Sequence, residues 1–358
     1  MAGCGRDAGP PKEYGYVSAR QAFLRDRIAV VYNKVATVQN GDRVQVLERK
    51  RRFLRVRTDA GAEGWIEQRF VAGQDVYDAL QQLARANAGL PAESTATARA
   101  ALNMHVEPSR VSPAIYQLKE GDKMVVLKRA VTEKGAPATP ALQKPDEAAR
   151  QDEELNEQEE EAVEAAKGKK QEAPAAPAAP LEDWWLVRDT AGRYGWVLGR
   201  MIDIDVPLDV AQYAEGQRII AGLVLDKVRD EAGGKDVPEY LVLLTDDRDG
   251  LPYDYNQVRV FSWNRRRGRY ETAYRDRLQG FLPVTVGKED LGKEGTLPTF
   301  TIRGKDDQGN IVSRKYQFNT PMVRLVTTPG EQPVRFARPL RSPQGGARNK
   351  AARRRIRR

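Results

Sequence analysis

The chain has 358 residues, of which 40% are hydrophobic and 30% are charged, and its formal net charge is +9. This length allows two or three domains of ordinary size with real hydrophobic cores. No apolar run approaches the ~20 residues that a membrane-spanning helix needs, and a single cysteine excludes a disulfide within one chain.

The positive charge is concentrated at the C-terminus. Residues 331–358 contain ten lysines and arginines against one acid, Glu331, and this excess equals the net charge of the whole chain. The body is therefore neutral, which argues against a uniformly basic nucleic-acid-binding body and predicts a disordered cationic tail over 329–358. The residues expected to contact an anionic polymer there are Arg353, Arg354, Arg355, Arg357 and Arg358.

Residues 1–13 are expected to form a disordered polar leader, and they hold the single cysteine, Cys4. The sequence Met1-Ala2-Gly3-Cys4 resembles the end of a bacterial lipobox, in which small residues precede a cysteine that becomes lipidated. The charged and apolar regions of a full signal peptide do not precede it in this sequence. The resemblance implies a lipid anchor at Cys4 of an outer-membrane lipoprotein in the periplasm. The alternative is a cytoplasmic protein with an inert thiol.

Two predicted domains, 14–72 and 96–205, share one sequence pattern. The first contains VQNGDRVQVLERKRRFLRVRTDAGAEGWIEQRFV from residue 38, and the second contains LKEGDKMVVLKRA from residue 118 and DWWLVRDTAGRYGWVLGRMI from residue 183. Apolar residues alternate with polar ones, as in strands with one buried face, and glycines mark the turns between them. Short strands with tight turns over ~60 residues predict small barrels.

The repeated pattern resembles the bacterial SH3 (SH3b) domain family, which has a Gly-Asp turn, two apolar strands and a closing Gly-Trp strand. The resemblance implies SH3-like barrels whose exposed aromatic residues and loops contact the ligand. On this basis Tyr16, Trp184 and Tyr194 are the predicted ligand-binding residues. Trp65 and Trp196, at matching places in the two copies, are expected in the cores.

A linker and an insertion separate these elements. In the linker, 73–95, the sequence GQDVYDALQQLARANAGL predicts one amphipathic helix. The insertion, 131–181, is acidic and then rich in proline and alanine, so it cannot bury enough apolar surface to order itself. We expect a disordered loop that is tolerated on the surface of the second barrel. The alternative is a functional segment, either a charged spacer or an intramolecular partner for the arginine tail.

Residues 206–328 predict a β-rich C-terminal domain: a sandwich, a barrel or a single propeller-blade-like sheet of about six to eight strands. One hairpin carries Arg265, Arg266 and Arg267 between Trp263 and Tyr270, a pattern that suits an anionic polymer. The favoured alternative is an exposed hairpin tip whose aromatic residues face the core.

The residues for an enzyme active site are scarce. One histidine, His105, and one cysteine lie in different segments, which disfavours a nucleophile–histidine pair and a zinc site. His105 is expected in a strand of the second barrel. The pair Asp246-Asp247 is expected in a surface turn rather than in a carboxylate or calcium site. We therefore expect no enzymatic activity, cofactor or metal.

The fold class that follows is mainly β: two small SH3-like barrels, a C-terminal β-rich domain and disordered segments. The function that follows is a non-enzymatic envelope protein that binds peptidoglycan or a protein partner. One alternative is a cytoplasmic nucleic-acid-associated protein that uses the arginine tail. Another is a structural scaffold without a cell-wall ligand, and a third is an enzyme with a carboxylate site in the C-terminal domain.

Overall fold

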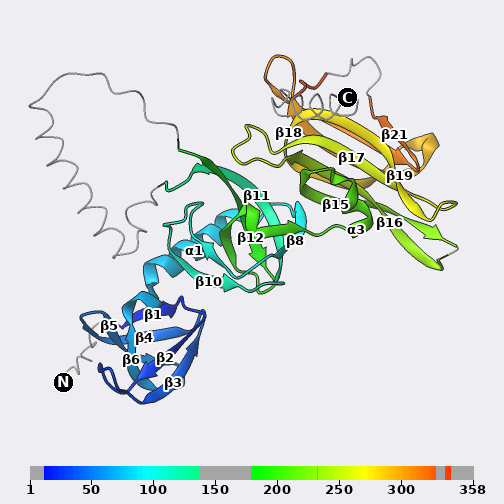
Figure 1. Cartoon of the computed structure of the whole chain (residues 1–358). Coiled ribbons are helices and arrows are strands. Elements are labelled where there is room, and N and C mark those ends of the chain that lie inside the picture. The colour runs from blue at the N-terminus through cyan, green and yellow to red at the C-terminus, as the bar shows by residue number, and fades with distance from the viewer. Residues whose placement is uncertain (1–11, 137–178, 232, 328–334, 340–358) are drawn as a thin grey trace, which may run out of the picture. The chain divides into compact units, whose positions relative to one another are not determined.

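The computed structural model describes residues 12–136, 179–231, 233–327 and 335–339 (Figure 1). The chain divides into two compact units, Met1–Asp205 and Val206–Arg358. The fold is mainly β, as the sequence predicts, with three antiparallel sheets of seven strands each. No helix among the described residues is long and apolar enough to cross a membrane.

The first sheet closes into a small barrel around an aliphatic core. Its strand order is β3-β2-β6-β5-β4-β1-β7. The core side chains come from alternate positions of the strands, which is the expected pattern for one buried face: Val17, Ala22, Leu24, Val38, Val44, Leu54, Val56 and Ile66. The elements are β1 (Glu13–Val17), β2 (Gln21–Arg25), β3 (Lys34–Gln39), β4 (Arg43–Lys50), β5 (Phe53–Thr58), β6 (Glu63–Glu67), η1 (Gln68–Phe70) and β7 (Val71–Gly73).

The second sheet repeats the first strand for strand. Its order is β10-β9-β13-β12-β11-β8-β14, in which every strand has its counterpart in the first barrel. The paired ends of β11 and β12 reach Glu133 and Leu181. The strands therefore continue a few residues into the segment predicted to be disordered, and residues 137–178 of that segment lie outside the described residues. The elements are β8 (Ser94–Ala98), β9 (Leu102–His105), β10 (Ala114–Leu118), β11 (Lys123–Glu133), β12 (Leu181–Asp189), β13 (Tyr194–Leu198), η3 (Gly199–Met201) and β14 (Ile202–Ile204).

The glycine of each Gly-Trp pair lets two strands approach closely. A Cβ atom at Gly64 would lie 2.8 Å from the Cβ of Leu24, and one at Gly195 would lie 2.6 Å from the Cβ of Met104. A larger residue would push β6 away from β2, or β13 away from β9. The repeated glycine is therefore a closure point of both barrels.

One helix, α1 (Gln74–Asn87), joins the two barrels, as the amphipathic pattern predicts. It contacts β1 and β7 of the first barrel and β13 of the second. A second link is Asn40, whose Nδ2 donates to the carbonyl of Ile115 at 2.6 Å and whose Oδ1 accepts from the N–H of Gln117 at 3.0 Å. The first unit therefore holds both barrels and the helix together.

The second unit is a single antiparallel sheet, which is one of the three forms expected from the sequence. Its strands follow chain order from β15 to β21. The buried residues on one face include Val242, Phe261 and Tyr270. The elements are α3 (Leu208–Ala211), η4 (Gln212–Ala214), β15 (Gln217–Asp230), β16 (Lys235–Asp246), β17 (Tyr255–Asn264), β18 (Arg269–Asp290), η5 (Gly292–Glu294), β19 (Thr296–Lys305), β20 (Ile311–Asn319) and β21 (Met322–Leu325).

Candidate ligand-binding face of the first barrel

The three aromatic residues predicted to bind a ligand are buried, so the expectation that they are exposed is wrong. Tyr16 and Tyr194 are each 8% exposed and Trp184 is 2% exposed. Tyr16 stacks on Tyr77 of α1, with ring centroids 4.1 Å apart, and its hydroxyl donates to Oε1 of Gln74 at 3.3 Å. Burial raises the pKa of the Tyr16 hydroxyl. Tyr16 therefore holds the linker helix rather than facing solvent.

Trp184 and Tyr194 are buried because α1 covers their side of the second barrel. They form one cluster with Leu186 and Trp196, against which Leu83 of α1 packs. This face points away from the barrel interior, since the intervening residues of β12 and β13 fill the core. The linker helix thus occupies the face on which the sequence analysis placed the ligand.

His105 lies at the edge of this cluster in β9, as expected for a strand residue of the second barrel. Its ring meets Trp184 edge to face at 5.5 Å, and Nδ1 lies 2.7 Å from the carbonyl oxygen of Ser112. These contacts fix the ring in place, which is a structural role.

The equivalent face of the first barrel is open. Strand pairing sets the correspondence: Arg55 pairs with Trp65 in β5 and β6, and Leu186 pairs with Trp196 in β12 and β13. Phe53 likewise matches Trp184. Arg55 is exposed, and Phe53 and Trp65 are half-buried, although Trp65 was expected in the core.

The charge of this face explains why no helix of the described residues packs on it. Arg55, Glu63 and Glu67 of the first barrel stand where the second barrel has Leu186, Tyr194 and Leu198. Burying charged side chains under an apolar helix costs free energy even when they form ion pairs, because the charges lose their hydration, whereas the apolar set gains from being covered. The same fold therefore has a covered face in one copy and a solvent-facing one in the other.

A cation held between aromatic rings forms the centre of the open face. The guanidinium carbon of Arg25 lies 4.3 Å from the ring centroid of Tyr32 and 5.4 Å from that of Phe53. Nη2 of Arg25 donates to Oε1 of Glu67 at 2.8 Å. Trp65 lies on the neighbouring strand, opposite Arg25. Rings, a cation and a carboxylate side by side can stack on a planar or sugar group and form hydrogen bonds at its rim.

The loop beside this face is closed by Asp26. The N–H of Asn33 donates to Oδ1 of Asp26 at 2.9 Å, and Nδ2 of Asn33 donates to Oδ2 at 3.0 Å. The hydrogen bond from Arg27, and then that from the Asn33 backbone, lower the pKa of Asp26 to about 2. The carboxylate therefore stays ionised and holds the base of the loop at neutral pH.

The arginine hairpin of the second unit has its aromatic residues turned toward the core, as the favoured interpretation of its sequence predicted. Tyr270 is buried, and Trp263 packs against it edge to face at 5.1 Å. Of the cations, Arg267 donates to Glu271 at 2.8 Å, while Arg265 and Arg266 are exposed. The basic–aromatic patch is therefore reduced to exposed cations, whose contact with an anionic polymer stays a prediction. Cys4 and the five arginines of the tail lie outside the described residues.

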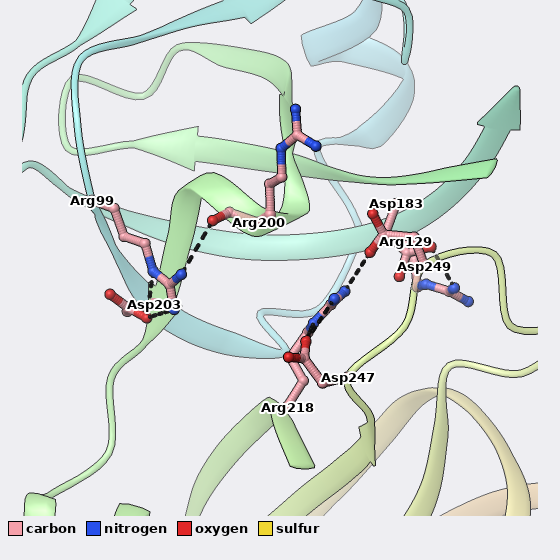
Figure 2. Close-up of polar contacts among 8 residues, drawn as sticks. All are labelled: Arg99, Arg129, Asp183, Arg200, Asp203, Arg218, Asp247 and Asp249. Carbon is pink, nitrogen blue, oxygen red and sulfur yellow. Dashed lines mark hydrogen bonds and ion pairs between the residues drawn. The ribbon is translucent and has the colours of Figure 1, made fainter. Parts of the chain in front are cut away.

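The acidic residues near Asp246 are held in ion pairs. Arg218 donates to Asp247 at 3.0 Å and to Asp249 at 2.7 Å (Figure 2). Asp247 and Asp249, in the turn after β16, are thus both paired with Arg218 of β15, and Asp246 is the last residue of β16. In the described part of the chain, no three His, Cys, Asp or Glu side chains gather closely enough to hold a metal ion.

Figure 2 also shows ion pairs of the second barrel. Arg129 donates to Asp183 at 2.7 Å, with both side chains about 5% exposed or less, and Nη2 of Arg99 donates to Asp203 at 2.5 Å. The first pair neutralises two buried charges between β11 and β12, and the second fastens β14 to the turn after β8. Both are structural contacts within the barrel.

The open face was not predicted from the sequence, although the sequence contains a signal for it. Aligning the two copies shows charged residues in the first at the positions of Leu186, Tyr194 and Leu198 in the second. That difference marks which copy keeps its outer face in solvent.

The family match lies in the first barrel, whereas a structural match extends over most of the chain. A family model described as a bacterial SH3 domain matches residues 23–72. No curated protein matches the chain in sequence. A solved structure titled "Structure of NlpC1 from Trichomonas vaginalis" is 8% identical and covers 75% of this chain and 89% of its own. Its TM-score of 0.15 is too low to carry an argument about fold or function.

Proposed function

We propose that the protein is a non-enzymatic component of the bacterial cell envelope that binds peptidoglycan or a protein partner through its first barrel. The observation that supports this is the open face with Arg25 between Tyr32 and Phe53 and beside Trp65. The bacterial SH3 match covers the same barrel. The second barrel, with its outer face under α1, serves in this proposal as the support that orients the first.

The anchor in this proposal is a lipid on Cys4, which places the protein on the periplasmic side of the outer membrane. Its support is the lipobox-like sequence around Cys4. Labelled palmitate, fed to the native host expressing the gene with its upstream DNA, should mark the wild type and not Cys4→Ser. Absence of label from both would remove the lipoprotein part of the proposal.

Ligand binding is tested by pull-down on purified sacculi with the full chain. Phe53→Ala combined with Trp65→Ala should abolish retention. The matched control is Tyr14→Ala, a half-buried aromatic of β1, a strand that borders β4 and β7 rather than β2 or β6. Equal retention of all three proteins would contradict binding by the open face.

If the wild type is not retained on sacculi, a photo-crosslinking residue at position 53 in living cells distinguishes the two ligand classes. A discrete crosslinked protein, lost in Trp65→Ala, would assign a protein partner. If the wild type is neither retained on sacculi nor crosslinked to a protein, the structural-scaffold alternative is the one that remains.

A further inference from the structure

The loop between β2 and β3 exposes aliphatic side chains to an unusual degree. Val30 is 99% exposed and Val31 is 83% exposed, and Ile28 beside them is also exposed. Val35 and Phe23, on the two strands that the loop joins, extend the apolar surface. Exposed apolar residues that occur singly are ordinary, whereas a contiguous group at a projecting tip indicates a contact surface.

The tip is presented by a structured base. The N–H of Asp26 donates a hydrogen bond to the Asn33 carbonyl at 3.1 Å. The backbone N–H and the side-chain amide of Asn33 each donate a further hydrogen bond to the Asp26 carboxylate. Tyr32 lies over Arg25. The apolar side chains therefore project from a closed loop, so little ordering entropy remains to be lost when the tip binds.

The same loop in the second barrel shows that the fold does not require this exposure. There Val106, Ser112 and Pro113 are buried, and the hydroxyl of Ser112 accepts a hydrogen bond from the N–H of Glu107 at 3.0 Å. Ser109 Oγ donates to the carbonyl of Ala136 at 2.5 Å. One copy folds its loop inward, and the other carries aliphatic residues outward.

Cations surround the apolar tip. Arg27 lies within the loop and Lys34 begins β3 directly after it, and the adjoining end of β4 and the β4–β5 turn present the exposed Lys50, Arg51 and Arg52. That turn is joined to the loop through Arg25, which contacts both Tyr32 and Phe53. Residues 12–73 contain thirteen lysines and arginines against seven acids, whereas residues 94–136 and 179–205 contain ten against nine. The apolar loop belongs to the strongly basic barrel.

We propose that the loop Asp26–Asn33 docks the first barrel onto an anionic lipid bilayer. Ile28, Val30 and Val31 enter the boundary between headgroups and acyl chains, and the surrounding lysines and arginines face the anionic headgroups. Aliphatic side chains supply the apolar contact and cations the attraction to anionic lipid, which is the combination that interfacial membrane binding needs. The inference goes beyond the proposed function, because it requires neither a ligand on the open face nor a lipid on Cys4.

Vesicle flotation of the full-length, unlipidated protein tests the docking. It should float with vesicles of phosphatidylcholine mixed with phosphatidylglycerol and not with phosphatidylcholine alone. Val30→Ser combined with Val31→Ser should weaken binding about tenfold or more, since two side chains lose their apolar contact. Val131→Ser is the matched control, an exposed valine of the second barrel. Equal weakening by the control, or none by the double variant, would overturn the proposal.

A second readout separates the loop from the basic tail, which also attracts anionic vesicles. An environment-sensitive fluorophore on Val30→Cys, in a Cys4→Ser background, should shift to the blue with anionic vesicles, whereas the same label on Val131→Cys should not. An unshifted label at position 30 on vesicle-bound protein would overturn the proposal. So would a dimer in solution that the double serine variant abolishes, because the loop would then cover a second copy of the chain.

Discussion

The rings of Tyr16 and Tyr77 lie parallel, with centroids 4.1 Å apart and an interplanar angle of 3°. This contact fastens the start of α1 to the first barrel, while Leu83 fastens its later turns to the second. One helix thereby covers the outer face of the second barrel and leaves the first barrel open. Because of this contact, Tyr16, which was predicted from the sequence to bind a ligand, instead holds the linker helix in place.

Removing the Tyr16 ring should destabilise the first unit. Tyr16→Ala loses a buried, stacked aromatic ring, and we expect a decrease of about 3 kcal/mol in the free energy of unfolding. Tyr16→Phe keeps the ring and loses only the hydrogen bond to Gln74, so it should cost about 1 kcal/mol or less. Urea unfolding of the full chain measures both. Similar losses for the two variants would contradict the stacking argument.

The matched tryptophans of the two barrels should differ in their effect on stability. Trp196 is buried under α1, so Trp196→Ala should cost about 3–5 kcal/mol. Trp65 is half-buried on the open face, so Trp65→Ala should cost less than about 2 kcal/mol. Denaturant unfolding of the two variants under one set of conditions provides the comparison. A larger loss at Trp65 would mean that the first barrel does not leave this face open.

Asp26 should titrate well below an ordinary aspartate. Its pKa is lowered to about 2, so its stabilising effect on the loop is present above the unfolded value of ~3.9 and is lost as the pH falls toward 2. Carboxyl NMR titration gives the pKa directly. Arg27→Ala should raise it toward the ordinary value, because the hydrogen bond from Arg27 is the main cause of the shift. An unchanged pKa in that variant would assign the shift to Asn33 alone.

In the second unit, Glu239 is fully buried, and burial raises its pKa. Its oxygens accept from the N–H of Trp263 at 3.1 Å and from the Thr320 hydroxyl at 2.6 Å, which offsets part of this effect. Because the folded state binds the proton more tightly, stability should fall as the pH rises from the unfolded value of ~4.3 through the folded pKa. Glu239→Gln should flatten this fall in a series of urea unfolding curves. If the stability of Glu239→Gln falls with pH as steeply as that of the wild type, another group causes the fall.

Two glycines of β18 should respond differently to alanine. A Cβ atom at Gly280 would lie 2.0 Å from the ring of Tyr255, which is fully buried, so Gly280→Ala should cost about 3 kcal/mol or more. At Gly287 the nearest atom, Oγ1 of Thr299, is 4.0 Å away, and the change should stay within about 1 kcal/mol. Thermal unfolding followed by circular dichroism compares them. Equal shifts in Tm would contradict the steric argument.

The sequence by itself determined the elements of this protein. Alternating apolar residues and glycine-marked turns predicted the strands of both barrels, and a 3.6-residue period predicted α1, because these patterns depend on neighbours along the chain. The repeat also predicted that the two domains share one fold, since equal patterns of turns and buried faces specify equal sheets.

Only the tertiary structure decided which face of each barrel is available. Leu83 and Trp184 are 101 residues apart, and nothing local to either shows that α1 packs on the second barrel. Burial of a strand's outer face is a property of the segment that covers it rather than of the strand. For that reason the aromatic residues chosen from the sequence lie under the helix, while Phe53, Trp65 and the loop at Val30 face solvent in the barrel that the helix leaves open.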